Sequence, residues 1–177
     1  SAQVALASLA KRAANFRSKS SIAPVYSIRK CIIESMETYL VSIQAYEDFL
    51  TDVSEDRFPR DKWNHAAHLS MAASIVARGG GIDEVRAAIL AYNKMQGIVS
   101  TPDSGYHETV TRFWCDRLAE LHRGLGRGAT AYDLARAAAA GLAHRRAIFR
   151  EYYSFDVIQS REARAKYIPP DVEAKHP

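Results

Sequence analysis

Two histidines, His65 and His68, stand three positions apart in a stretch of apolar and small residues. Residues three apart lie on one face of a helix, and the apolar stripe that continues through Leu69, Ala72 and Ile75 contains both rings. The spacing therefore predicts two imidazoles that point inward from the start of one helix. A buried histidine most often only hydrogen-bonds to the backbone. Two on one stripe can also transfer a proton or bind a metal.

A third histidine, His107, opens the apolar face of a helix predicted over residues 106–123. Helices joined by short loops usually pack antiparallel to their neighbours. The helices that begin with His65 and His107 should therefore point the same way and place all three imidazoles at one end of the molecule. The helices that run the other way should bring further polar residues to that end: Glu47, Tyr92, Asn93, Gln96, Tyr152 and Tyr153. We therefore expect one shared polar site.

Helix N-termini carry positive potential, which favours anions and neutral imidazoles. The first hypothesis is acid–base chemistry on a small anionic substrate, in an elimination, cyclisation, isomerisation or hydrolysis. Its catalytic residues are His65, His68, His107 and Tyr92. Its substrate-binding residues are Asn93, Gln96, Glu47, Glu108, Arg112, Tyr152, Tyr153 and Arg164. Glu47 and Glu108 also have a simpler interpretation, because the first lies at the border of an apolar face and the second is four residues before Arg112.

The second hypothesis is a divalent transition metal held by His65, His68 and His107, with Glu47 or Glu108. Histidines at i and i+3 are a less common ligand pair than the i and i+4 pair of His-Glu-x-x-His, which the sequence lacks. Both carboxylates are also marginal candidates. The sequence therefore favours a site without metal or cofactor. A third hypothesis is a binding protein or partner subunit that holds a ligand without converting it.

Length and composition limit the class of protein. The 177 residues are enough for one domain with a single core. No apolar run approaches the roughly 20 residues of a membrane span. Cys31 and Cys115 are isolated and form no Cys-x-x-Cys pair, so neither a zinc knuckle nor a disulfide scaffold is indicated. We expect a cytoplasmic protein.

The net charge of +4 comes from the start of the chain, where no acidic residue precedes Glu34. We interpret residues 1–26 as a basic arm that packs on this chain or on a neighbour, which predicts a homo- or hetero-oligomer. An organellar transit peptide, and an arm that binds lipid or nucleic acid, are the alternatives. Acids and bases alternate through most of the remaining chain, which argues against a nucleic-acid surface.

Apolar residues recur at helical spacing along the chain, and no strand pattern is present. We predict an all-α, single-domain antiparallel helical bundle of about six main helices and a short C-terminal one, in which residues 27–177 form the bundle domain. The first helix lies in the basic arm. The others are expected at residues 27–53, from a cap at Asp61 to the glycines at 79–81, and at 82–96, 106–123, 130–152 and 160–167. The predicted core contains Trp114, Ile75, Ile89, Leu118, Met36 and Leu142.

Several motifs resemble those of a family of small bacterial helical proteins with no established activity. They are Trp63-Asn64-His65-Ala66-Ala67-His68-Leu69, the run from Ser104 to Trp114, Tyr152-Tyr153-Ser154, the run from Ser160 to Arg164, and Pro170-Asp171. The most specific part is Tyr106-His107-Glu108-Thr109. The resemblance covers about residues 43–171 and implies a helical fold, but no activity. Catalytic triads, Walker loops and dinucleotide-binding glycines are absent from the sequence.

Overall fold

The computed structural model describes residues 37–143 and 145–172, and all regular structure in these residues is helical. The α-helices are α3 (Ile43–Ser54), α4 (His65–Val76), α5 (Ile82–Met95), α6 (Glu108–Leu125), α7 (Ala131–Gly141) and α8 (Arg161–Ala165). Short 3-10 helices are η1 (Thr38–Leu40), η2 (Arg60–Lys62) and η3 (Arg146–Glu151). No strand occurs in this part of the chain, which confirms the all-α prediction. The basic arm at residues 1–26 lies outside the described residues.

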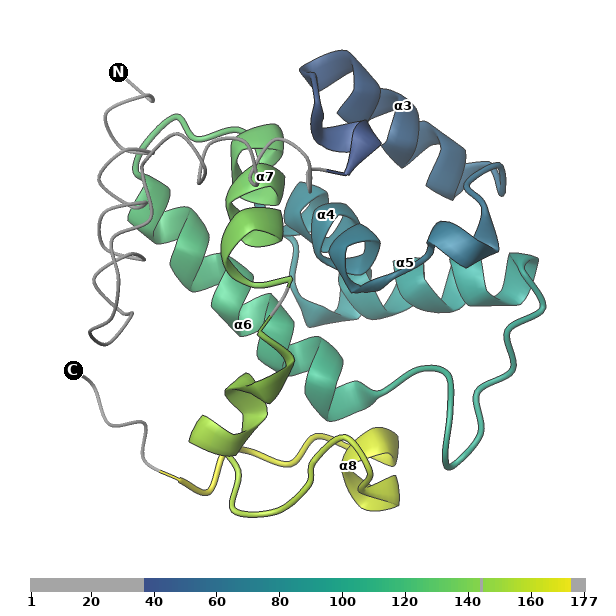
Figure 1. The fold of residues 1–177 in the computed structure, drawn as a ribbon, viewed down its shortest axis with the longest axis vertical. Helices are drawn as coiled ribbons and strands as arrows, with labels where there is room; N and C mark the ends of the chain where they lie inside the picture. The colour runs from purple at the N-terminus through teal and green to yellow at the C-terminus, as the bar shows by residue number, and fades with distance from the viewer. Residues whose placement is uncertain (1–36, 144, 173–177) are drawn as a thin grey trace, which may run out of the picture.

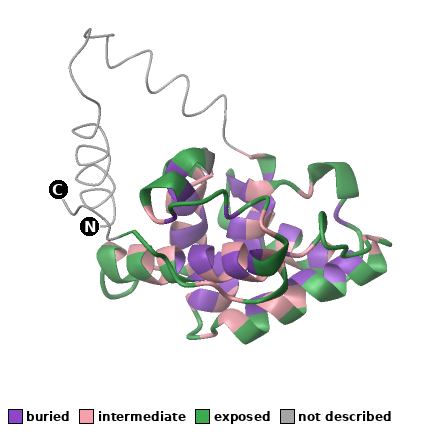
Figure 2. Cartoon of the chain, turned by 90° about the horizontal axis from the view of Figure 1, so that it is seen from below, coloured by how far each residue is buried: buried purple, intermediate pink, exposed green. Residues whose placement is uncertain are grey.

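Helix α4 is the centre of the fold. It contains no charged residue, and nine of its twelve residues are buried. A helix that is apolar on all sides is stable only when other elements cover it. Figure 1 shows α4 nearly end-on, with α3, α5, α6 and α7 around it, and Figure 2 shows buried residues gathered on the inner sides of the helices. The packing of α4 is most extensive against α7, where alanines on both helices permit a close approach.

The other long helices run in different directions around α4. Figure 1 shows α5 lying across the view, α6 running diagonally and α7 standing upright. Each of α5, α6 and α7 contacts α4, and α6 also contacts α5, α7 and α8. Side chains that open two of these helices therefore need not meet at one end of the molecule.

Polar caps fix where the helices begin. Asn64 caps α4 by accepting a hydrogen bond from the Ala67 amide at 3.0 Å. The predicted cap Asp61 instead lies in the 3-10 turn that follows Pro59. The residue Ser42 caps α3, so the predicted helix at 27–53 is interrupted there; its part before residue 37 lies outside the described residues.

The predicted helix at 130–152 begins as expected, where Thr130 and Asp133 form a capping box. It ends at Gly141, and the 3-10 helix η3 follows in place of further α-helix. Glycine has a low helix propensity, and the amides of Leu142 and Ala143 both bond to the carbonyl of Ala138, which closes the helix.

Most of the predicted core is observed. Trp114, Ile89 and Leu118 are buried, and Leu118 is fully enclosed. Ile75 and Leu142 pack against the core but keep some exposure. Met36 lies outside the described residues. None of the described helices is both long and apolar enough to span a membrane.

Candidate active site at the start of α4

The histidine pair of α4 lies among aromatic rings from three segments. The ring of His68 makes an edge contact with Trp63, with centroids 4.4 Å apart, and Trp63 in turn packs against Tyr92 of α5 at 4.0 Å. The ring of His65 lies 4.8 Å from Trp114 of α6. The two imidazoles are close enough for the charge of His65 to affect the titration of His68. The predicted pairing of these histidines on one helix face is therefore observed.

His68 is held in its neutral form. Burial lowers its pKa to about 4, and a charge on His65 would lower it further. Within the described residues, its Nε2 atom is enclosed by protein and has no hydrogen-bond partner. The same holds for the indole Nε1 of Trp63, in the adjoining ring. The great majority of buried polar atoms are paired, so two unpaired ones in adjoining rings mark this cluster as the candidate site.

His107 has a different environment from the α4 pair. It is the N-cap of α6: its Nδ1 accepts a hydrogen bond from the Val110 amide at 3.3 Å. Because Nδ1 accepts, the ring proton is on Nε2, which donates to the carbonyl of Val157 at 3.0 Å. Burial lowers the pKa of His107. Both nitrogens are thus bonded within the protein, and His107 has a structural function in place of the predicted catalytic one.

The predicted polar residues of α3 and α5 do not converge on the pair. The hydroxyl of Tyr92 donates to the carbonyl of Phe58 at 2.9 Å, and burial raises its pKa. Asn93 is buried next to it in sequence. The amide of Gln96 donates to Asp56, and Glu47 is exposed on α3. Of these residues, only Tyr92 has a contact to an aromatic ring of the site, and its hydroxyl is already bonded.

Glu108 joins α6 to α5. Its carboxylate accepts hydrogen bonds from Arg86 Nε and from the Tyr106 hydroxyl, both at 2.8 Å, and its side chain is only 13% exposed. The Arg86 guanidinium lowers the pKa of Glu108. The predicted partner Arg112 instead lies over the ring of Tyr167, 4.5 Å from its centroid. Arg86, 22 positions away, carries no local sequence signal of this pairing.

The remaining predicted residues hold the C-terminal segment on α6. Tyr152 accepts a hydrogen bond from Arg117 at 2.9 Å. Tyr153 donates to the carbonyl of Ile168 at 3.1 Å. Arg164 donates to the carbonyls of Gly105, Tyr106 and Ile158. These hydrogen bonds are all within the protein, and they give the three side chains a structural function that needs no ligand.

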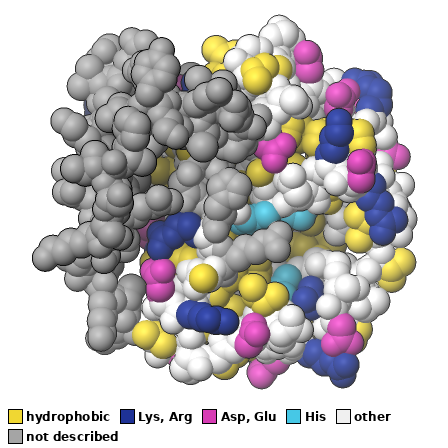
Figure 3. Space-filling view, in the orientation of Figure 1, with side chains coloured by type: hydrophobic (Ala, Val, Ile, Leu, Met, Phe, Trp, Pro, Cys, Tyr) yellow, Lys and Arg dark blue, Asp and Glu magenta, His cyan; other side chains and the backbone are white. Residues whose placement is uncertain are grey.

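The three histidines do not form a set of metal ligands. Over residues 37–143 and 145–172, no group of three or more His, Cys, Asp or Glu side chains is arranged to hold a metal ion. Figure 3 shows histidine side chains at more than one place on a single face, each bordered by hydrophobic side chains. The candidate site is therefore the α4 pair with Trp63 and Trp114, and the two tryptophans are the site residues that the sequence analysis did not select.

Comparisons of the chain with protein-family models, with curated proteins and with solved structures give no significant match. The family resemblance of the sequence motifs therefore stays a prediction, and the function rests on the geometry of the site.

Proposed function

We propose that the protein is a small-molecule enzyme whose proton-transfer site is the histidine pair at the start of α4. The observation that carries the proposal is the enclosed Nε2 of His68, which has no hydrogen-bond partner in the described residues, beside the equally unpaired Nε1 of Trp63. His107 is left out of the catalytic group because both of its ring nitrogens are bonded within the protein. Tyr92 is left out because its hydroxyl is bonded to Phe58.

The two histidines have different tasks in this proposal. His68, with a pKa of about 4, is neutral near pH 7, and a neutral imidazole can polarise a carbonyl by donating a hydrogen bond. His65 then takes the proton from the carbon beside that carbonyl, and the electron pair of the C–H bond moves to the carbonyl oxygen. Return of the proton to another atom completes an isomerisation, and loss of a neighbouring leaving group completes an elimination.

A small carboxylic acid is the substrate class that fits the surroundings. The indole Nε1–H of Trp63 can only donate, so it suits a carboxylate or carbonyl oxygen. Both histidines lie in the first turn of α4, a twelve-residue helix, whose N-terminal end favours a negative charge. The rings of Trp63 and Trp114 offer apolar contact to the rest of a small molecule.

Exchange of carbon-bound hydrogen in deuterated water tests proton abstraction without knowledge of the product. A panel of small oxo- and hydroxycarboxylates would be incubated with the protein, and loss of the α-proton signal followed by NMR. We expect exchange of at least one compound, reduced about 100-fold or more in His65→Gln and His68→Gln. His122→Gln, at the far end of α6, is the matched control and should exchange at the parent rate. Exchange that persists in both α4 variants would contradict the proposal.

A ligand-binding protein without turnover is the second candidate, and the unpaired indole Nε1–H of Trp63 favours it. This group can hold an oxygen atom of a ligand by donating a hydrogen bond, but it does not exchange a proton as an acid or base. In that case panel compounds would shift the imidazole NMR signals of His65 and His68 without any hydrogen exchange. That result would replace catalysis by binding at the same site.

A further inference from the structure

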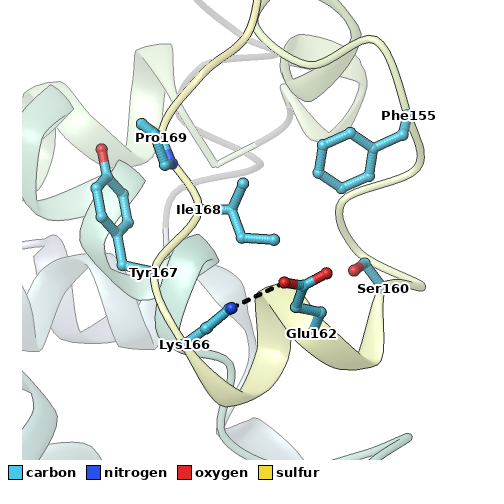
Figure 4. Close-up of a pocket in the computed structure, with 7 residues that line it drawn as sticks. All are labelled: Phe155, Ser160, Glu162, Lys166, Tyr167, Ile168 and Pro169. Atoms are coloured by element: carbon cyan, nitrogen blue, oxygen red, sulfur yellow. Dashed lines mark ion pairs between the residues drawn. The ribbon is translucent and has the colours of Figure 1, made fainter.

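A second candidate site lies beside α8, away from the histidine pair. It is an open hollow of about 510 Å³, within the usual size range of small-ligand sites. It is lined by Phe155, Ser160, Glu162, Lys166, Tyr167, Ile168 and Pro169. Figure 4 shows the Ile168 side chain pointing into the hollow from one wall and Phe155 facing it from the other, with Glu162 and Lys166 along the floor.

The wall formed by residues 166–169 is held in place from behind. The Thr109 hydroxyl donates to the carbonyl of Lys166 and accepts from the amide of Ile168, both at 2.9 Å. Tyr153 donates to the Ile168 carbonyl from the other side. Thr109 is fully buried, so these bonds are shielded from water. The backbone that shapes the hollow is thus already fixed before any ligand enters.

The floor is held as well. Ser160 caps α8 by accepting from the Ala163 amide at 3.1 Å. Arg161 makes a two-fold contact with Asp103, at 2.7 and 2.9 Å, and Arg164 bonds to backbone carbonyls of the loop before α6. A five-residue helix would be unstable alone, and these contacts to distant residues keep it in position.

The charges on the floor are balanced. Lys166 Nζ lies 2.9 Å from Glu162 Oε1, and both side chains are about two thirds exposed. An exposed pair of this kind contributes little to the stability of a fold, so a ligand can replace it at little cost. A ligand with a single charge would leave one of the two residues without a partner. A ligand that carries both charges would satisfy both residues.

The apolar part of the lining lies above this pair. Phe155 keeps 37% of its surface exposed, and Ile168 and Pro169 face the same space (Figure 4). An apolar group inserted between Phe155 and Ile168 would remove their exposed surface from water, which favours binding. The charge pair and the apolar walls together fit a ligand that has a zwitterionic head and an apolar side chain.

We propose that the hollow beside α8 binds a free apolar α-amino acid. The ligand carboxylate pairs with Lys166, the ammonium group pairs with Glu162, and the side chain packs between Phe155 and Ile168. This site shares no residue with the histidine pair of α4. The proposed amino-acid binding is therefore independent of the proposed enzyme activity.

Titration of the ¹⁵N-labelled full chain with L-leucine and L-phenylalanine, followed by amide NMR, tests the proposal. We expect the amides of Ile168 and of its neighbours in the hollow to shift, with a dissociation constant of about 1 mM or tighter. Three comparators each lack one feature: N-acetyl-leucine lacks the ammonium group, leucine amide lacks the carboxylate, and glycine lacks the side chain. Each should bind at least about fivefold more weakly, a loss of about 1 kcal/mol.

Two conservative variants assign the contacts. Lys166→Gln and Glu162→Gln should each weaken leucine binding at least about fivefold. Lys94→Gln, an exposed lysine of α5, is the matched control and should bind as the parent does. The same spectra report whether each variant is folded. Absence of any shift up to about 20 mM amino acid, equal binding of N-acetyl-leucine, or undiminished binding by both charge variants would overturn the proposal.

Discussion

The Nε2 atom of His68 has no hydrogen-bond partner in the described part of the chain, whereas His107 uses both ring nitrogens within the protein. Both rings open an apolar helix face, so helical periodicity treats them alike. The difference arises because Val157, fifty positions after His107, brings a carbonyl to that ring. The unpaired Nε2 atom of His68, more than its position on a stripe, selects the start of α4 as the candidate site.

The lowered pKa of His68 predicts a loss of stability on the acid side. In the unfolded chain its pKa returns to about 6.5, while in the folded protein it is about 4. Between these values the unfolded state binds a proton and the folded state does not. The stability is therefore fully present above about pH 6.5 and falls as the pH drops toward 4, by up to about 3 kcal/mol. Urea unfolding at several pH values measures it.

His68→Gln cannot take up this proton, so its free energy of unfolding should depend less on pH over the same range. His122→Gln removes a histidine elsewhere and should keep the dependence of the parent protein. If the parent and His68→Gln lose stability equally between about pH 6.5 and 4, other groups cause the loss. Folding then does not lower the pKa of His68.

The cap made by His107 predicts a stability effect of its own. His107→Ala removes the acceptor for the Val110 amide and the donor to Val157, and should lower the free energy of unfolding by about 2 kcal/mol. His107→Asn keeps a good N-cap and should lose about half as much. Urea unfolding of both variants at pH 7 measures this. An alanine variant as stable as the asparagine variant would contradict the capping role.

At the scale of the helices, periodicity and local signals predict α4, α5, α6 and α8 close to their observed bounds. They fail where the chain changes structure without a strong signal: at Ser42, which interrupts an apolar stripe, and at Gly141, after which η3 replaces the expected helix. Both breaks occur in sequences that are compatible with helix, so the choice depends on packing against the rest of the fold.

The site was predictable only in part, for a geometric reason. His65 and His68 belong to one helix, and their pairing follows from its period alone. Bringing His107 to them requires α4 and α6 to lie with their axes nearly parallel, and Figure 1 shows the two helices in different directions. Contacts between distant segments, such as that of Arg86 with Glu108, do not affect the local spacing of residues. The sequence therefore does not predict them.

The link between α5 and α6 predicts that Glu108 stabilises the fold. Glu108→Ala would leave Arg86, which is one third exposed, without its more buried partner and should cost about 2 kcal/mol. Because Arg86 lowers the pKa of Glu108, this contribution is present above the ordinary carboxyl pKa and is lost as the pH falls through the lowered one. Urea unfolding at neutral and acid pH measures both effects.

Asp83 offers the matched control, because it also pairs with Arg86 but its side chain is 82% exposed. Asp83→Ala should change the free energy of unfolding by less than about 0.5 kcal/mol. Equal effects of the two substitutions would mean that burial of the Glu108 pair does not matter.

At the scale of the whole molecule, the packing that encloses α4 affects both the stability of the fold and the positions of the candidate site residues. The helix that carries His65 and His68 is covered by α5, α6 and α7, so the positions of both rings depend on how tightly these helices close around it. Protein interiors are packed as densely as organic crystals. A change of volume on α4 away from the histidines should therefore reach them through the packing.

Ala73 tests this dependence, since it is fully buried in the middle of α4. Leucine at this position requires space for three more carbon atoms, and overpacking of this kind costs typically 1–3 kcal/mol. Ala73→Leu should therefore lose stability in urea unfolding and shift the imidazole NMR signals of His65 and His68. The exposed Ala87 of α5 provides the control: Ala87→Leu should change stability by less than about 0.5 kcal/mol and leave both imidazoles unshifted. If Ala73→Leu is as stable as the parent, α4 has free space around it and is not the tightly enclosed centre of the fold.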